Sequence, residues 1–191
     1  MQVGSRHPVA WTFSAVTAVY INHQRNDLYW LDFRVLKLSM NASDTPSVLK
    51  QLRKASWKFQ QTFKTLKKLE PFVASIISTG GPQTACVTIE QIVFEPKNLI
   101  DQLTRYSLPP RCGKGASVTA TGRHEIEELL QAAFADWVDF LFVPSPKPFV
   151  IYADHDEYAT FYANTRSNLN RISEALSLQG FEKIAEYTRP L

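Results

Sequence analysis

The 191-residue sequence predicts an α+β protein in which helices pack on an antiparallel sheet. Three observations predict this class. Several short runs alternate apolar with polar residues, as strands do. Other segments repeat apolar residues every three or four positions, as amphipathic helices do. Short polar or proline-rich segments join neighbouring strand-like runs, as antiparallel hairpins require. In chain order, the elements form two β-β-α-β-like halves joined by further helices.

Composition is consistent with a folded domain. Hydrophobic residues make up 45% of the chain and charged residues 20%, close to the average for globular proteins. The length suits a single domain that covers residues 1–191. The most loop-like stretch, PPRCGKGAS at 109–117, marks a candidate internal boundary near 108–118.

The first half opens with a predicted hairpin. Residues 11–21 and 28–38 both alternate with a period of two, and the polar residues 23–27 join them. Residues 41–44 are predicted to form a loop, because Asn, Ser and Asp are typical of turns and helix caps.

The segment from Thr45 to Leu69 is predicted to form a long basic helix. Pro46 suits its first turn, and Pro71 is expected to end or kink it. Its apolar stripe has helical spacing: Leu49, Leu52, Ser56, Phe59, Phe63 and Leu66. No acidic residue interrupts the segment before Glu70. The residues predicted to contact a partner are Lys50, Arg53, Lys54, Trp57, Lys58, Lys64, Lys67 and Lys68.

The middle of the chain is predicted to contain a strand and two helices. The strand covers residues 84–95, and a short helix follows at 98–106. A long acidic helix is expected from Gly122 to Leu141, with Thr121 as its cap. Its apolar residues recur with helical spacing up to Leu141, which is why the predicted helix extends that far.

The C-terminal part is predicted to contain strands at 149–153, 158–163 and 181–187. A helix is expected at 167–178, closed by Gly180 in the left-handed conformation that glycine favours. If helices cover one face of the resulting sheet, the other face is left for a second copy of the chain or another partner.

Composition and motifs argue against several classes of protein. Two cysteines are too few for a disulfide framework, so we expect free thiols and a cytoplasmic protein. We expect no transmembrane helix, because no run of about 18 apolar residues occurs. Gly113-Lys114-Gly115 lacks the spacing of a phosphate-binding loop, and no histidine pair has helical metal-ligand spacing. We therefore expect no cofactor and no metal.

The densest group of acid–base residues is Asp154, His155, Asp156 and Glu157. Between two apolar strands, this run is best interpreted as a hairpin turn, because aspartate favours turns. Consecutive residues do not all point one way, which argues against convergence on one ligand. The alternative is a metal-dependent hydrolase or nuclease that uses these four residues as its catalytic site.

The leading interpretation is a non-catalytic interaction or adaptor protein. The basic segment 45–69 is expected to dock an anionic partner, either nucleic acid or an acidic protein surface. Lysines are compact point charges, better suited to non-specific contacts than to reading base edges. A purely structural role, in which this segment balances the acidic helix, is the competing interpretation.

Overall fold

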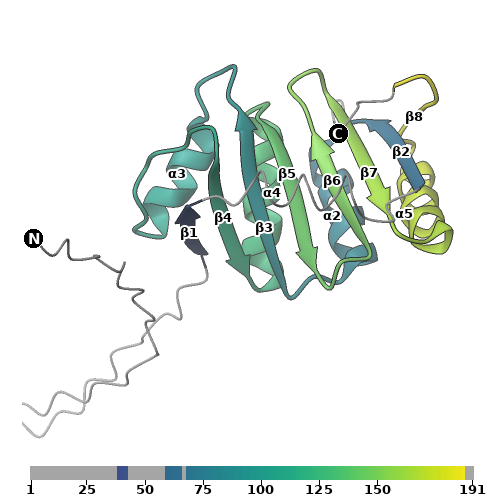
Figure 1. Ribbon diagram of the computed structural model, residues 1–191, viewed down its shortest axis with the longest axis horizontal. Coiled ribbons are helices and arrows are strands. Elements are labelled where there is room, and N and C mark those ends of the chain that lie inside the picture. Colours follow the sequence, from purple (N-terminus) through teal and green to yellow (C-terminus); the bar gives the residue numbers. More distant parts are fainter. Residues whose placement is uncertain (1–37, 43–58, 66–67, 188–191) are drawn as a thin grey trace, which may run out of the picture. The chain divides into compact units, whose positions relative to one another are not determined.

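The computed structural model describes residues 38–42, 59–65 and 68–187 (Figure 1). These residues form an eight-stranded sheet in which all neighbouring strands are antiparallel. The helices of the described ranges pack on this sheet, which confirms the predicted α+β class. None of these helices is both long enough and apolar enough to cross a membrane.

The strands follow the order β1-β4-β3-β5-β6-β7-β2-β8 across the sheet. Their bounds are β1 Leu38–Ala42, β2 Phe59–Lys64, β3 Thr84–Gln91, β4 Ala116–Thr121, β5 Asp139–Ser145, β6 Phe149–Ala153, β7 Tyr158–Ala163 and β8 Lys183–Ile184. Strand β2, from the first half of the chain, lies between β7 and β8 from the second half. The division into two β-β-α-β halves stays a prediction.

The described helices are α2 Leu69–Gly80, α3 Lys97–Arg105, α4 Arg123–Ala135 and α5 Arg166–Leu178. In Figure 1, helices α2, α4 and α5 lie behind the sheet. Helix α3 packs against α4 and contributes Leu99 and Leu103 to the same core. The N-terminus of α3 is capped by Asp136, the residue that follows α4. Its carboxylate accepts hydrogen bonds from the backbone N–H groups of Asn98 and Leu99.

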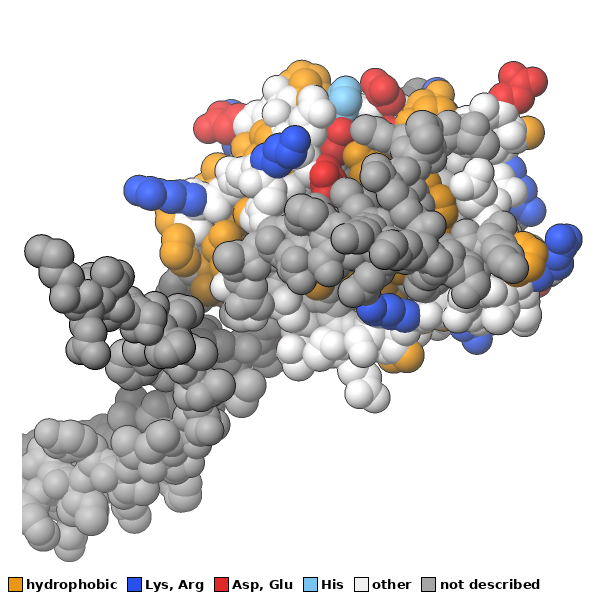
Figure 2. All heavy atoms as spheres, in the orientation of Figure 1, with side chains coloured by type: hydrophobic (Ala, Val, Ile, Leu, Met, Phe, Trp, Pro, Cys, Tyr) orange, Lys and Arg blue, Asp and Glu red, His pale blue; other side chains and the backbone are white. Residues whose placement is uncertain are grey.

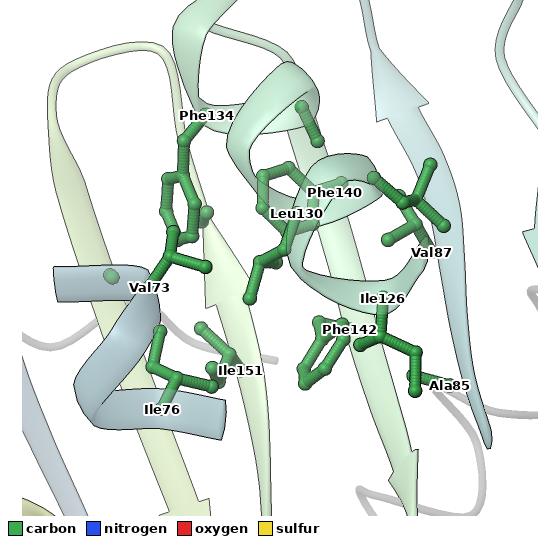
Figure 3. Close-up of a cluster of buried hydrophobic side chains, with 14 of the residues drawn as sticks. Val73, Ile76, Ala85, Val87, Ile126, Leu130, Phe134, Phe140, Phe142 and Ile151 are labelled. Atoms are coloured by element: carbon green, nitrogen blue, oxygen red, sulfur yellow. The ribbon is translucent and has the colours of Figure 1, made fainter. Parts of the chain in front are cut away.

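The main core lies between the helices and one face of the sheet. Figure 3 shows Phe140 and Phe142 of β5 pointing toward Ile126 and Leu130 of α4. Phe72 of α2 is fully buried. Its ring makes edge-on contacts with those of Phe134, Phe161 and Phe181 at centroid distances of 5.5, 6.1 and 4.9 Å. This aromatic packing joins α2 to α4, to β7 and to the segment after α5.

The other face of the sheet, called here the open face, carries a second and smaller apolar cluster. It consists of Leu141, Val150, Tyr152 and Tyr162, with Val143 packed against them. Hydroxyl pairs between opposite residues flank this cluster on both sides. Thr88 and Ser117 pair at 2.9 Å on one side, and Thr62 and Thr160 pair at 2.9 Å on the other. The open face is thus apolar in the middle and polar toward both edges.

The long basic helix is the main prediction that the structure contradicts. Residues 59–64 form strand β2, with Phe63 in the core and Thr62 on the open face. Phe59 and Phe63 are four residues apart, a spacing that puts side chains on one face of a helix and of a strand alike. Pro71 does not end a helix but lies in the first turn of α2, where its missing N–H costs nothing. Residues 45–58, 66 and 67 lie outside the described residues.

The acidic helix is shorter than predicted. Helix α4 ends at Ala135, and Trp137 adopts a positive φ of 53° before β5 begins at Asp139. The apolar residues 138–142 fit a helix stripe and a buried strand equally well, and the turn at Trp137 separates the two elements. Thr121 ends strand β4, which was not predicted, and Gly122 takes the cap position.

Most of the remaining elements appear where the sequence predicts them. Strand β3, helices α3 and α5 and strands β6 and β7 match the predicted segments to within a few residues. Gly180 has a φ of 81°, as expected at a helix end. The last strand is only Lys183–Ile184, and Asn41 and Ala42 belong to β1 and not to a loop. The hairpin predicted for 11–38 lies outside the described residues, apart from Leu38.

Candidate functional site

The residues that combine charge with defined geometry gather around the turn between β6 and β7. Asp139, the first residue of β5, faces this turn, which spans Asp154–Glu157. Tyr187, near the C-terminal end of the described chain, reaches the same place. Figure 2 shows acidic side chains along the upper edge of the molecule, the edge that carries the β6–β7 turn in Figure 1.

Asp139 holds His155 by two contacts. Its carboxylate Oδ1 accepts a hydrogen bond from the backbone N–H of His155 at 2.8 Å and lies 2.7 Å from the ring Nδ1. Because the carboxylate is an acceptor, Nδ1 carries a proton and Nε2 is the remaining ring nitrogen. The hydrogen bond to Asp139 raises the pKa of His155, against the opposing effect of burial. Asp139 is fully buried, and the His155 side chain is 30% exposed.

Asp154 shapes the turn itself. Its Oδ1 accepts hydrogen bonds from the backbone N–H groups of Asp156 and Tyr158, at 3.0 and 3.1 Å. This is the Asx arrangement by which aspartate stabilises turns. The Tyr187 hydroxyl donates to Oδ2, and the Tyr187 ring stacks on Tyr158 at a centroid distance of 4.3 Å. Asp154 therefore joins the turn to the C-terminal segment.

The four predicted acid–base residues are near one another, but each has different partners and a different exposure. Asp156 is 68% exposed and lies 3.9 Å from Nε2 of His155. Glu157 has a φ of 71°, and its carbonyl accepts hydrogen bonds from the backbone N–H and the hydroxyl of Thr65. Within residues 38–42, 59–65 and 68–187, no three His, Cys, Asp or Glu side chains are grouped so that they could hold a metal ion. The turn interpretation agrees with this geometry.

Asp139 is the residue of this site that sequence reasoning missed. Asp139 falls within the predicted helix 122–141 and is counted there among the acidic residues of that helix. The available signal was the run Asp139–Val143, in which a single acid precedes four apolar residues. Its closeness to His155 depends on the pairing of β5 with β6, which is not visible in local sequence.

The predicted partner-binding residues are described only in part. Lys64 is the last residue of β2 and is partly buried, and Lys68 is exposed just before α2. Because β2 is a strand, these two lysines do not continue a helical ridge. The others, Lys50, Arg53, Lys54, Trp57, Lys58 and Lys67, lie outside the described residues.

The described residues are acidic as a set. They hold 11 of the 21 basic residues but 15 of the 18 acidic ones. The excess of positive charge therefore comes from the remaining ranges, which hold five of the seven basic residues between Thr45 and Glu70.

A groove of about 820 Å³ lies between α2, α3 and α4. Its charged lining residues are Glu70, Asp101, Glu128 and Arg105. Arg105 pairs with Glu128 at 3.3 Å, and the Tyr106 hydroxyl also donates to Glu128. The groove carries a net negative charge and does not resemble a site for an anion.

The two cysteines are free thiols, as predicted. Burial raises the pKa of Cys112 to about 11, with a further contribution from Asp136. A thiol with so high a pKa is a poor nucleophile at neutral pH, so Cys112 is not a candidate catalytic residue.

No protein-family model, curated protein or solved structure matches this chain. Any assignment of function therefore rests on the residues themselves.

Proposed function

We propose that this protein is a non-catalytic binding protein that docks an anionic partner through its basic stretch. The observation that carries the proposal is the separation of charge along the chain. Seven Lys and Arg residues occur between Thr45 and Glu70 with no acid among them, while the described residues are acidic as a set. Such a local concentration of positive charge attracts phosphates or carboxylates even when the net charge of the protein is only +3.

The partner is either nucleic acid or an acidic protein surface. Lys and Arg contacts to phosphates release condensed counterions, so binding to nucleic acid weakens steeply with salt. A discrete acidic protein surface has fewer charges and gives a shallower dependence. Trp57 lies within the basic stretch and supplies an aromatic surface on which a base could stack.

The experiment is fluorescence anisotropy of labelled DNA, RNA and polyglutamate across a salt series. We expect at least one of these probes to bind at low salt. The Lys50→Glu/Lys54→Glu and Lys64→Glu/Lys68→Glu variants should weaken binding and flatten its salt dependence. Lys114→Glu/Lys147→Glu is the matched control, because both lysines are exposed and lie outside the basic stretch.

The class of partner is inferred from which probe binds. Selective binding of DNA or RNA assigns nucleic acid, and selective binding of polyglutamate assigns an acidic protein. Equal weakening by the control variant, or no binding of any probe at low salt, would contradict the proposal.

One observation favours a second candidate, hydrolysis by acid–base chemistry at His155. A buried carboxylate fixed on Nδ1 is the arrangement that orients an imidazole for proton transfer at Nε2. The test is hydrolysis of a chromogenic phosphodiester with and without Mg²⁺, compared between the unmodified protein and His155→Ala. Equal rates in the two proteins would exclude this candidate, and equal rates with and without Mg²⁺ would exclude its metal-dependent form.

A further inference from the structure

The floor of the groove between α2, α3 and α4 is one stripe of α4. Helix α4 lies between the other two helices in Figure 1 and contacts both. Its lining residues are spaced three and four apart, as one face of a helix requires: Glu128, Gln131, Ala132 and Ala135. The start of α2 forms one wall, and α3 forms the other. The volume of about 820 Å³ lies within the range of ligand sites, roughly 300–1,000 Å³.

The charge of the groove favours a cation. Its lining includes the carboxylates of Glu70, Asp101 and Glu128 and one guanidinium, that of Arg105, which leaves a net charge of −2. Arg105 is already paired with Glu128. Glu70 and Asp101 are exposed, and neither has an ion-pair partner within residues 38–42, 59–65 and 68–187. The two walls thus each present a carboxylate that can attract a cationic group.

A buried polar side chain lies at the foot of the α3 wall. Gln102 is fully buried, and within the described part of the chain neither its Nε2 nor its Oε1 has a hydrogen-bond partner. It follows Asn98 by four residues and precedes Arg105 by three, and both of these line the groove. Residues at these spacings share one side of a helix, so Gln102 is on the groove side of α3. Tyr106, four residues further, also reaches α4, where its hydroxyl donates to Glu128.

The Gln102 amide is the feature that indicates the kind of ligand. A buried donor or acceptor without a partner destabilises the fold, and an apolar side chain of similar size would avoid that cost. Buried polar groups in folded proteins almost always have partners, either in the protein or in bound molecules. An amide side chain offers donors and an acceptor in one plane, which match the C=O and N–H of a peptide group.

Charge and amide together select one class of ligand. A metal ion fits poorly, because no three metal-ligating side chains are grouped together within the described ranges. A free polyamine is attracted by the carboxylates, but its protonated amines have no acceptor for the N–H groups of Gln102. A peptide with lysine or arginine side chains supplies a cation and a backbone acceptor. It also supplies methylene groups that pack on Leu69, Ala132 and Ala135.

We propose that the groove between α2, α3 and α4 binds a basic peptide segment of a partner protein. Cationic side chains of the peptide pair with Glu70 and Asp101, and their methylene groups pack on the alanines of the floor. Gln102 turns toward the groove and exchanges hydrogen bonds with the peptide backbone, since side-chain rotations of this kind are common when a partner binds. The inference does not rest on the proposed function, because the two sites take partners of opposite charge.

The test is fluorescence anisotropy of a short labelled peptide of alternating lysine and alanine, titrated with the full chain at low salt. Glu70→Gln/Asp101→Asn should weaken binding about tenfold, because two ion pairs are lost. Gln102→Met removes the amide but keeps the length of the side chain. It should weaken binding about fivefold without lowering the midpoint of thermal unfolding. Ala135→Trp, at an exposed position, fills the groove and should abolish binding.

The matched control is Glu174→Gln/Glu182→Gln, which removes the same number of charges from exposed positions outside the groove and should leave binding unchanged. Circular dichroism confirms that each variant is folded, and the other two variants keep the test available if Gln102→Met unfolds. Equal weakening by the control, or unchanged binding in folded Gln102→Met, would overturn the proposal. Binding of spermine without binding of the peptide would overturn it as well.

Discussion

The two faces of the sheet are packed in different ways. The helix face is an extended hydrocarbon and aromatic core to which strands β1–β7 and the four described helices contribute. The open face has a narrow apolar strip with hydroxyl pairs on both sides of it. Its end near the β6–β7 turn carries the Asp139–His155 pair and Asp154. One face is therefore uniformly apolar, and the other changes from apolar to polar over a few strands.

This difference has an energetic consequence. Burial of apolar area contributes most of the stability of a domain, so the helix face should dominate the free energy of unfolding. Paired hydroxyls contribute little net energy but restrict which strands and registers fit together. The open face should therefore contribute less to the free energy of unfolding and more to the choice of strand order and register.

The largest effect should come from the aromatic centre of the helix face. Replacing Phe72 with Ala removes a fully buried ring that contacts three other rings, and we expect it to lower the free energy of unfolding by about 3–5 kcal/mol. Chemical denaturation measures the change. The control is Phe94→Ala, because Phe94 is 57% exposed and its loss should cost within about 0.5 kcal/mol.

The next prediction compares the two faces directly. Leu141 on the open face and Leu130 on the helix face are both fully buried. If both faces are packed, Leu141→Ala and Leu130→Ala should each cost about 2–4 kcal/mol in denaturation experiments, with Leu130 at the upper end. A cost below about 1 kcal/mol for Leu141→Ala would mean that the apolar cluster of the open face is only loosely packed around Leu141.

Local sequence predicts the alternation of the central strands well, and with it the fold class. Val87 and Ile89 of β3 face the helices while Thr88 between them faces away, which is the period of two that a strand imposes. The helix from Arg166 is equally visible, because Thr165 caps it and accepts a hydrogen bond from the backbone N–H of Asn168. Where the apolar residues fit only one periodicity, or a helix has a capping residue, the local sequence is sufficient to predict the element.

Local sequence does not distinguish a helix from a strand where the apolar residues fit both the helical and the strand periodicity. Phe59 and Phe63 suit a helix and a strand equally, and only the pairing of β2 with β7 and β8 decides for the strand. The Asp139–His155 pair is likewise set by strand pairing between residues sixteen positions apart. Contacts between residues that are distant in sequence therefore determine both the place of β2 in the sheet and the geometry of the candidate site.

The smallest effect concerns the titratable end of the open face. The hydrogen bond to Asp139 raises the pKa of His155 in the folded protein. A raised pKa means that this contact stabilises the fold fully below the unfolded pKa of about 6.5 and loses that contribution as pH rises through the folded pKa. Because the His155 side chain is partly exposed, solvent screens the interaction and the pH dependence should be modest.

The variant that tests this is His155→Gln, which cannot gain a proton. Its backbone N–H can still donate to Asp139, so the turn geometry is kept. Across about pH 5 to 9, the unmodified protein should lose stability relative to His155→Gln as pH rises. His124→Gln is the control, because His124 is exposed on α4 and remote in sequence from the β6–β7 turn. If the His155→Gln and unmodified proteins follow parallel curves, the imidazole does not act as a charged partner of Asp139. The polar end of the open face would then stabilise the fold through hydrogen bonds that do not depend on a charged imidazole, such as those that Asp154 accepts from its turn and from Tyr187.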